Sequence, residues 1–330
     1  MKLYIKKDTT DCYEEILAVE LDSQRMLYRV ETAAYSNCLV QLVAARDLSK
    51  LPEEKILYMA ANQPKDMDKH PNVALSIPIA AVYDSSFAYC GYMYPRPFAD
   101  TIALTHLSTF QRRPMSKLKR FADKTEWHNK FERDEVGIKN RFKLLYNLSK
   151  ALHLIPRNYL PVYITPEDIR ITAKGKIAIE NLHLSQVDAI SKHFALSQSF
   201  TTDYATKAGK AAVLKGDAVK VEDMLFSYAV MFYQVLMGVH PYGGTILRPP
   251  YDKCVEIGQC IDNDLFAFGS KAEYITFPES FNLHSTFHTL PVEIQELFKR
   301  AFGTASASRP TLEEWGKGFY NGVVQLDSKN

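Results

Sequence analysis

The pattern of apolar residues in this chain changes near residue 98, and the change limits the folds that it can adopt. Before that point the sequence has short alternating or β-branched runs separated by polar turns, which is typical of strands. After it, apolar residues recur at helical spacing, as Phe142, Leu145 and Leu148 do within residues 140–155. The sequence therefore predicts an α+β protein with a small β-rich lobe followed by a large helical lobe.

Individual helices and one further hairpin are expected within this plan. Residues 51–64 follow Ser49, a candidate N-cap, and stop before Pro64, which predicts a helix inside the β-rich part. Residues 221–238 are apolar on almost all sides, which predicts a buried central helix closed by Gly238. Further elements are predicted as two amphipathic helices in 291–302 and 311–323, a two-stranded hairpin in 162–187 with its turn at Ala173, Lys174 and Gly175, and a polar loop in 191–220.

Composition and charge exclude several classes of protein. Hydrophobic residues make up 46% of the 330 residues and charged residues 24%, values typical of folded domains and not of disordered, collagen-like or coiled-coil chains. The net charge of +2 is too small to indicate a nucleic acid or a membrane as the partner. Seven Lys or Arg between residues 112 and 130 could contact nucleic-acid phosphates, but no aromatic stacking array or zinc module accompanies them. Nucleic-acid binding is therefore not expected.

The sequence also predicts where the protein resides. The N-terminus breaks its apolar residues with charges, so it cannot form the apolar core of a secretory signal, and nowhere do eighteen apolar residues run together. The five cysteines, at positions 12, 38, 90, 254 and 260, form no CxxC pair, which suits a reducing compartment. We expect a cytoplasmic protein without a membrane partner, although export through an unrecognised signal would leave the same composition.

Residues 27–50 raise a specific question about phosphate binding. The runs LYRVE and CLVQLVAA predict two strands that flank a turn, as in a phosphate-binding hairpin, yet the whole segment contains no glycine. Side chains from Ala33 to Asn37 would project where backbone amides otherwise surround a phosphate, and positive φ angles are restricted without glycine. The segment is therefore expected to form a hairpin but not a good phosphate clamp.

Four segments along the chain occur in an informative order. They are HPNVALSIPIAAVYDSSFAYCGYMYPRP (70–97), MFYQVLMGVHPYGGT (231–245), ELFKRAF (296–302) and SRPTLEEW (308–315). In this order they resemble the protein kinase fold, in particular a group of bacterial kinase-like proteins. The first is similar to the fourth and fifth strands and the hinge of the small lobe, and the others are similar to the central helix and the C-terminal helices of the large lobe. The resemblance implies a kinase-like N-lobe with extra N-terminal strands in 1–95 and a C-lobe in 96–330.

The kinase resemblance implies positions for the nucleotide-binding residues. The run VAAR matches the strand that carries the phosphate-binding lysine, so Arg46 replaces that lysine, and this substitution is not neutral. The resemblance places the acidic partner of this residue at Glu53 or Glu54, and the hinge that contacts the nucleotide near Tyr92 and Tyr94. As an alternative, the two acids are simply the solvated first turn of a helix, where the helix dipole favours negative charge.

The resemblance also places the catalytic and metal-binding residues. The run PVYITPEDIRI matches the catalytic loop and puts Tyr163 at the usual catalytic aspartate position, where a phenol with a pKa of about 10 is a poor general base. Asp168 then stands at the asparagine position and Glu180 at the metal-binding aspartate position, which leaves two carboxylates for a divalent metal. As an alternative, Asp168 is a turn residue and Glu180 an exposed charge at a strand end. Asn181 and Leu182 replace the rest of the switch triplet.

The same resemblance implies roles for two charged residues of the helical lobe. In kinases the arginine at the position of Arg309 pairs with the glutamate of an APE sequence, which residues 191–220 lack. Arg309 therefore has no obvious partner in the sequence. Asp223 is expected to supply the acid at the start of the central helix.

These departures from the kinase pattern favour a pseudokinase, a kinase-like scaffold that acts by binding another protein. The alternative is an atypical kinase-fold transferase that moves a phosphoryl group, AMP or glutamate with Arg46, Asp168 and Glu180, without an acid at Tyr163. ATP with magnesium or manganese would be the cofactor of a residual nucleotide site or of the transferase. Candidate surfaces for a protein partner are the groove facing the hinge, residues 191–220, and the basic segment with Arg112, Arg113, Lys117, Lys119 and Arg120. An ordinary solvated linker also explains the basic segment.

Overall fold

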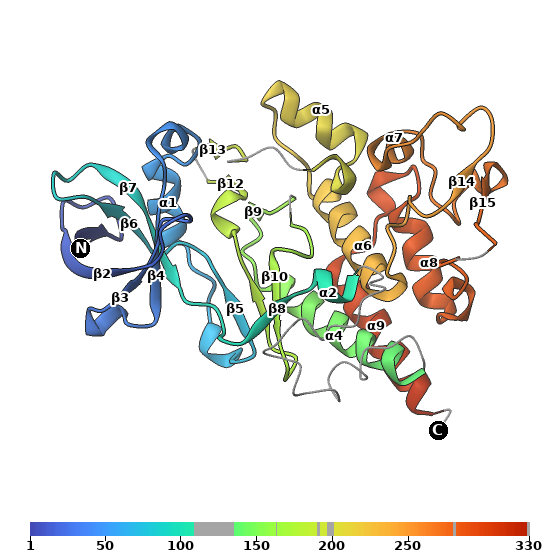
Figure 1. Cartoon of the computed structure of the whole chain (residues 1–330), viewed down its shortest axis with the longest axis horizontal. Coiled ribbons are helices and arrows are strands. Elements are labelled where there is room, and N and C mark those ends of the chain that lie inside the picture. Colours follow the sequence, from blue (N-terminus) through green and yellow to red (C-terminus); the bar gives the residue numbers. More distant parts are fainter. Residues whose placement is uncertain (109–134, 163, 190–191, 197–200, 280–281, 329–330) are drawn as a thin grey trace. The chain divides into compact units, whose positions relative to one another are not determined.

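A computed structural model of the chain describes residues 1–108, 135–162, 164–189, 192–196, 201–279 and 282–328. It is a mixed α+β structure, β-rich in its N-terminal region and helical in its C-terminal region, which confirms the predicted fold class at that level (Figure 1). The chain forms two compact units. The first comprises Met1–Ala99, Ile155–Pro161 and Ala178–Ser199, and the second comprises Asp100–Leu154, Val162–Ile177 and Phe200–Asn330. The first unit thus takes in two later segments that a division after residue 95 leaves in the second lobe.

Six strands of the first unit form a closed barrel. Their order around the barrel is β1, β2, β3, β4, β7 and β6, and all neighbouring strands are antiparallel. The strands are β1 (Lys2–Lys6), β2 (Glu14–Asp22), β3 (Leu27–Val30), β4 (Cys38–Leu42), β6 (Ala80–Tyr83) and β7 (Tyr89–Pro95). Closure pairs every strand on both sides, so the barrel has no free edge.

Alternate side chains of these strands fill the barrel. On β2, Ile16 and Ala18 are buried, whereas Leu17, Val19 and Leu21 are exposed, as the two-residue period of a strand requires. The interior consists of Leu3, Ile5, Ile16, Ala18, Val30, Val40, Ala80, Val82 and Met93. This apolar set explains why the charge-interrupted N-terminal sequence still folds as strands.

The glycine-free segment folds as the predicted hairpin. β3 pairs with β4, with Leu27 opposite Gln41. The connection contains a short 3₁₀ helix, Ala33–Tyr35, and none of residues 31–37 has a positive φ angle. The backbone amides of this turn therefore do not form the left-handed concavity that binds phosphate in other loops.

The helix α1 (Glu53–Ala61) packs against β6 in the first unit (Figure 1). It begins after Pro52 and not near Ser49, because a 3₁₀ helix, Ala45–Lys50, occupies the preceding residues. Its buried residues are Lys55, Ile56, Leu57 and Met59. The apolar ones extend a second core cluster whose buried members are Leu51, Ile56, Leu57, Ala81, Tyr83 and Tyr92.

The two later segments of the first unit contribute further strands. β12 (Gln186–Asp188) pairs with β9 (Tyr159–Leu160) and with β13 (His193–Phe194). The hydroxyl of Tyr159 donates a hydrogen bond to the carbonyl of Asn62 at 3.0 Å, which ties β9 to the end of α1. After β5 (Val73–Leu75), the amide of Ser76 donates to the carbonyl of Ile179 at 2.9 Å.

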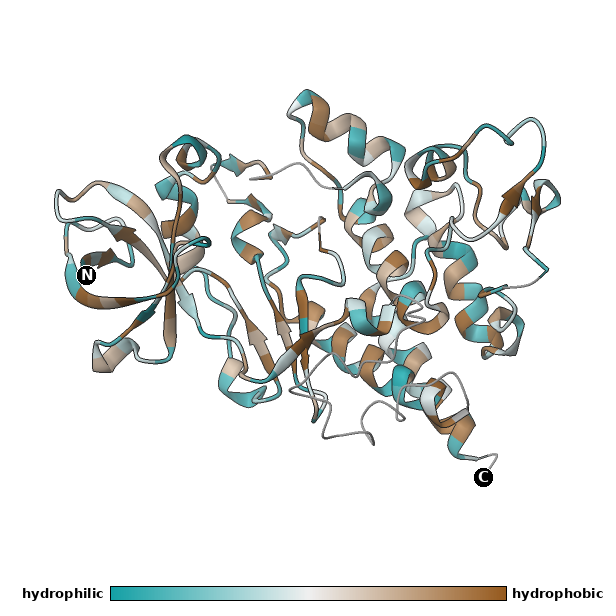
Figure 2. Ribbon diagram, in the orientation of Figure 1, coloured by the Kyte–Doolittle hydropathy of each residue, from teal (hydrophilic) through white to brown (hydrophobic). Residues whose placement is uncertain are grey.

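In the second unit, α4 (Glu135–His153) and α9 (Leu312–Asp327) pack along each other. The ring of Phe142 stacks on that of Phe319 with centroids 6.2 Å apart. A Cβ atom at Gly322 would lie 3.1 Å from the ring of Phe142, so the glycine allows the two helices to approach closely. In Figure 2 both helices show alternating brown and teal bands, as helices with one buried face do.

The helix α6 (Val221–Met237) is buried along most of its length, as predicted for a central helix. Phe232 meets Trp315 of α9 at 5.4 Å between ring centroids, and Tyr233 meets Phe298 of α8 (Val292–Ala301) at 5.0 Å. Gly238 ends the helix with a φ angle of 69°, which confirms the predicted C-cap. Although α6 is strongly apolar, none of the helices in the described ranges has both the length and the hydropathy to span a membrane.

The segment 191–220, predicted as a loop, contains the helix α5 (Lys207–Lys215). The hydroxyl of Thr206 caps its start by accepting a hydrogen bond from the amide of Gly209, and Gly216 ends it with a φ angle of 73°. The prediction was wrong for these residues. The threonine and glycine caps were visible in the sequence, but the polar composition of the segment concealed them.

The predicted hairpin in 162–187 is confirmed. Its strands are β10 (Ile169–Thr172) and β11 (Ile177–Ile179), and Gly175 in the turn has a φ angle of 76°. β10 also pairs with β8 (Thr101–Ala103). The remaining elements of the second unit are α2 (Thr105–Ser108), β14 (Ile246–Leu247), α7 (Ile257–Asp262) and β15 (Ile275–Thr276).

Candidate functional site

Arg46, the predicted counterpart of the phosphate-binding lysine, does not lie on a strand. β4 ends at Leu42, and Arg46 belongs to the 3₁₀ helix Ala45–Lys50. Its side chain is 88% exposed, and its Nε atom lies 3.5 Å from the carboxylate of Asp47. The expected strand position is therefore wrong, because the chain turns into the 3₁₀ helix first. The guanidinium contacts its neighbour in the sequence and not the interior of the first unit.

Glu53 and Glu54, the predicted partners of Arg46, bind other residues of the first unit. Glu53 accepts a hydrogen bond from the hydroxyl of Tyr83 at 2.5 Å. Glu54 forms an ion pair with Lys192 between exposed side chains. The arginine–glutamate pair that the resemblance implies is therefore not formed in this structure.

Tyr92, a predicted hinge residue, is buried against His183. Its exposed fraction is 4%, its hydroxyl lies 3.0 Å from Nδ1 of His183, and the two ring centroids are 4.5 Å apart. Burial and the nearby Lys55 ammonium lower the pKa of His183 to about 3, so the imidazole is neutral at pH 7. The side chain of Tyr92 is thus committed to packing within the first unit.

Lys55 on α1 was not predicted as a site residue, although it is fully buried. Its exposed fraction is 0%, and its Nζ donates to the carbonyl of Ala195 at 3.4 Å. Burial lowers the pKa of Lys55 to about 7, so the ammonium loses much of its charge near neutral pH. A signal was present in the sequence, because Lys55 and Met59 stand at i,i+4 spacing and share a helix face.

Tyr94 and Glu180 influence each other in the first unit. Burial, and to a smaller extent the Glu180 carboxylate, raise the pKa of Tyr94 to about 12, while Arg25 acts in the opposite direction. The phenol therefore stays protonated at neutral pH. The structure thus brings together two of the residues that the resemblance singled out.

Asp168 has the surroundings of a turn residue. Its carboxylate accepts hydrogen bonds from the amide of Thr165 at 2.9 Å and from the hydroxyl of Thr165 at 3.0 Å, just before β10. Asp168 belongs to the second unit and Glu180 to the first. No group of three His, Cys, Asp or Glu side chains that could hold a metal ion occurs among the residues with described positions. The predicted metal-binding role of Asp168 and Glu180 stays a prediction.

Two predicted sites lie outside the described residues. Tyr163, at the position of the catalytic aspartate, is one of them. The other is the basic segment with Arg112, Arg113, Lys117, Lys119 and Arg120. Their predicted roles stay predictions.

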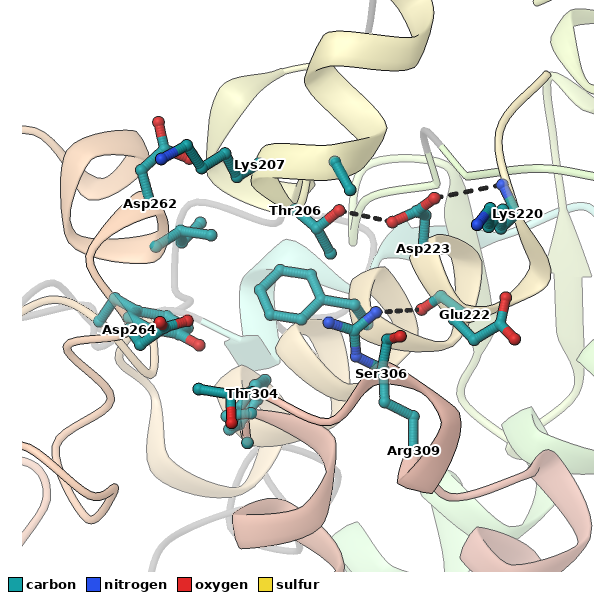
Figure 3. Close-up of a pocket in the computed structure, with 16 residues that line it drawn as sticks. Thr206, Lys207, Lys220, Glu222, Asp223, Asp262, Asp264, Thr304, Ser306 and Arg309 are labelled. Atoms are coloured by element: carbon teal, nitrogen blue, oxygen red, sulfur yellow. Dashed lines mark hydrogen bonds between the residues drawn. The ribbon is translucent and has the colours of Figure 1, made fainter. Parts of the chain in front are cut away.

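The second unit contains a pocket of about 380 Å³ (Figure 3). Its walls come from the starts of α5 and α6, the end of α7 and the connection between α8 and α9. The charged residues that line it are Lys207, Lys220, Glu222, Asp223, Asp262, Asp264 and Arg309. No single motif predicts this pocket, because five separate stretches of the chain build it.

Asp223 joins the starts of α5 and α6. Its carboxylate accepts hydrogen bonds from the hydroxyl of Thr206 and, at 3.1 Å, from the amide of Lys220 (Figure 3). The Thr206 hydroxyl in turn accepts from the amide of Gly209 at 2.9 Å. An acid therefore stands at the start of the central helix as expected, and its charge stabilises the first turns of both helices.

Arg309 forms no ion pair with any residue in the described part of the chain. Its Nη1 donates to the carbonyl of Glu222 at 2.9 Å, and its Nε donates to the carbonyl of Ala301 at 3.3 Å. The guanidinium also lies over the ring of Phe226, 5.2 Å from its centroid. Burial lowers the pKa of Arg309, and the nearby carboxylates of Asp223, Glu222 and Asp264 act in the opposite direction.

No protein-family model matches the sequence, and no curated protein matches it at a significant level. A functional assignment for this chain therefore depends on its own residues and their geometry.

Proposed function

We propose that this chain is a pseudokinase, a kinase-like scaffold that binds another protein and does not carry out efficient phosphoryl transfer. The order of its elements supports the kinase-like part of the proposal. Along the chain of the first unit, α1 follows β4 and precedes β6 and β7. A kinase small lobe has its lysine strand, its glutamate helix and the strands before the hinge in the same order. In the second unit, Gly238 closes α6 and Thr311 of the RPT sequence caps α9, where the matching motifs would place them.

The observation that carries the proposal is that β4 bears no cation. The strand CLVQL contains neither lysine nor arginine, and Arg46 lies beyond its end with an exposed side chain. Lys55 is buried on the helix, and its pKa of about 7 leaves it only partly charged at neutral pH. Kinases hold the α and β phosphates with a fixed lysine on this strand. Neither Arg46 nor Lys55 reproduces that lysine.

The lack of glycine in the first unit supports the same conclusion. The first glycine of the chain is Gly91, so the turns of the β2–β3 and β3–β4 hairpins both lack one. Gly91 itself is required for strand packing, because a Cβ atom there would lie 2.2 Å from the carbonyl oxygen of Gln41. In hairpin turns without glycine, side chains keep a ligand away from the backbone amides.

The alternative, an atypical kinase-fold transferase, would require Arg46, Asp168 and Glu180 to act on a nucleotide. Arg46 contacts Asp47, and Asp168 accepts two hydrogen bonds from Thr165. A nucleotide or its metal would have to compete with these local contacts. They therefore favour the scaffold over the transferase.

A thermal-shift titration with ATP and either magnesium or manganese tests the proposal. A ligand that prefers the native state raises the Tm by an amount that grows with its concentration relative to its Kd, so binding is visible without knowledge of the reaction. We expect no metal-dependent rise of the Tm with millimolar ATP. A metal-dependent rise that is lost in Asp168→Ala or Glu180→Ala would contradict the proposal and favour the transferase.

Arg46→Ala and Arg29→Ala form a matched pair for the same titration. Both arginines are about half or more exposed, and each pairs with an acid close in sequence, Asp47 and Glu31 respectively. We expect both variants to respond to ATP as the unmodified chain does. An ATP response that depends on Arg46 but not on Arg29 would count against the scaffold.

A further inference from the structure

Cys254 and Cys260 lie on either side of the start of α7. Cys254 precedes the first helical residue, Ile257, and Cys260 lies inside the helix. The Sγ atom of Cys260 donates a hydrogen bond to the carbonyl of Cys254 at 3.8 Å, and Nδ2 of Asn263 donates to Sγ of Cys254 at 3.7 Å. Because Cys260 and Asn263 stand three residues apart, the same side of α7 makes both contacts. The two thiols therefore lie along one side of this helix.

The two thiols are close enough to affect each other electrostatically. Burial raises the pKa of Cys260 to about 11, and the Cys254 thiolate contributes in the same direction. A disulfide needs its two Cα atoms within about 7 Å of each other and side chains that turn toward each other. The hydrogen bond from the Cys260 sulfur already places it beside the main chain of Cys254. When the Cys254 side chain turns away from Asn263, the Asn263 amide keeps its hydrogen bond to the carbonyl of Gln259 at 2.9 Å.

Cys38 and Cys90, which also lie on neighbouring elements, cannot form a disulfide. They belong to the paired strands β4 and β7. Cys38 stands opposite Pro95, so Cys90 lies five residues away from that position along β7. Five residues of a strand span about 16 Å, more than twice the reach of a disulfide. Cys38 and Cys90, both partly exposed, are therefore reference thiols for Cys254 and Cys260.

We infer that Cys254 and Cys260 form a reversible disulfide, which makes the start of α7 a redox-sensitive modification site. Cys254 is partly exposed, whereas Cys260 is only 5% exposed, so a small oxidant reaches Cys254 first. Cys260 then lies beside the modified sulfur and completes the bond. In a reducing compartment such a disulfide is transient and senses the redox state. The inference does not depend on the kinase-like proposal.

A small-molecule disulfide is the class of oxidant that the reaction uses. The Cys254 thiolate attacks one sulfur of the small disulfide, which gives a mixed disulfide and releases one small thiolate. The Cys260 thiolate then attacks the Cys254 sulfur, so the bond between the two cysteines forms and the second small thiolate leaves. The cysteines lose two electrons, the small disulfide gains them, and the two released thiolates take up the two cysteine protons. Closure should be slow at neutral pH, because burial keeps Cys260 mainly protonated.

The disulfide would tie the segment before α7 to a helix that other parts of the second unit contact. Nζ of Lys210 on α5 donates to the carbonyl of Gly258 at 3.2 Å and pairs with the Asp262 carboxylate at 2.5 Å. Closing the short loop before the helix removes conformations from its opened states. The backbone amides of residues 257–262 should therefore exchange more slowly with deuterium in the oxidised chain. Equal exchange in the oxidised and reduced chains would contradict this consequence.

The test is oxidation of the full native chain with oxidised glutathione, followed by denaturation and alkylation of the remaining thiols with N-ethylmaleimide. Trypsin releases both cysteines in one peptide, 254–271, because no Lys or Arg lies between Lys253 and Lys271. We expect this peptide to lack both labels and two hydrogen atoms, and to regain both thiols with dithiothreitol. Cys38 and Cys90 should be labelled. The inference is overturned if the peptide 254–271 carries two labels, or glutathione on Cys254 beside a labelled Cys260.

Serine variants separate the two steps of the exchange. In Cys260→Ser the mixed disulfide on Cys254 should accumulate about tenfold or more above its level in the unmodified chain, because no second thiol resolves it. Cys90→Ser is the matched control and should form the Cys254–Cys260 bond as the unmodified chain does. Cys254→Ser, at the more exposed position, should leave Cys260 unoxidised, and it tests the order of the steps even if Cys260→Ser does not fold. Equal mixed disulfide in Cys260→Ser and the unmodified chain, or oxidation of Cys260 in Cys254→Ser, would overturn the inference.

Discussion

The hydroxyl of Tyr92 lies 3.0 Å from Nδ1 of His183, and the two rings pack with their centroids 4.5 Å apart. This contact joins β7 to the segment that follows β11, far away in the sequence. It involves Tyr92, which the kinase resemblance predicts to be a hinge residue that contacts the nucleotide. The contact therefore commits the side chain of Tyr92 to the packing of the first unit.

Tyr92→Phe should destabilise the first unit. The change removes the hydrogen bond to the buried imidazole of His183, which should lower the free energy of unfolding by about 1–2 kcal/mol. Urea unfolding followed by tyrosine fluorescence measures the change. Tyr94→Phe is the matched control, because the hydroxyl of Tyr94 has no hydrogen bond to a residue of described position. Equal effects of the two substitutions would contradict the assigned role of His183.

Lys55 should make stability rise with pH above neutrality. Its pKa is about 7 in the folded chain and 10.5 when unperturbed, so the unfolded chain binds more protons between these values. The free energy of unfolding should therefore increase by a few kcal/mol from pH 7 to pH 10, at about 1.4 kcal/mol per pKa unit.

Lys55→Met should flatten this pH dependence and stabilise the chain at pH 7, because an apolar side chain of similar length carries no desolvation penalty. Denaturant unfolding at several pH values measures both effects. Lys50→Met, at an exposed neighbouring lysine, should leave the slope unchanged. If Lys55→Met keeps the slope of the unmodified chain, Lys55 is not the titrating group.

His183 should make the chain sensitive to acid. Its pKa is about 3 in the folded state against an unperturbed 6.5, so the unfolded chain takes up the proton first. Stability should fall as the pH drops from 6.5 toward 3. His183→Gln removes this proton uptake, and its acid-unfolding curve should be less steep. His153→Gln, at the exposed end of α4, is the control, and a loss of slope there instead would contradict the role of His183.

Gly91→Ala should be strongly destabilising. The added Cβ would lie 2.2 Å from the backbone oxygen of Gln41 on the neighbouring strand, so the barrel would have to shift, at a cost of about 2 kcal/mol or more. Gly175→Ala meets no atom within 4 Å and should cost only about 1 kcal/mol, from its positive φ angle. Chemical denaturation compares the two. A smaller loss for Gly91→Ala than for Gly175→Ala would show that the strands are not packed as described.

Much of the fold could be predicted because it follows from local patterns. Gly238 and Gly175 mark a helix end and a turn through their positive φ angles, and these depend on a few neighbouring residues. The hairpin in 27–42 follows from alternation alone. The balance of strands and helices could likewise be read from the change in period near residue 98.

The features that were missed depend on contacts between distant segments. Lys55 interacts with Ala195 and His183, which are far from it in the sequence. No local sequence pattern predicts these interactions. The predicted position of Arg46 on a strand was wrong because β4 ends earlier than expected and a short 3₁₀ helix follows it. The pocket around Arg309 combines five stretches of the second unit, which only the folded chain brings together.

Transfer of the radiolabelled terminal phosphate of ATP, with magnesium or manganese, tests the pseudokinase proposal most directly. The acceptors are the chain itself and a general protein substrate, and the reference is the double variant Arg46→Ala and Asp168→Ala. The proposal predicts no transfer above that reference. Transfer at a rate usual for kinases, about 1 per second or faster, that vanishes in the double variant would contradict it.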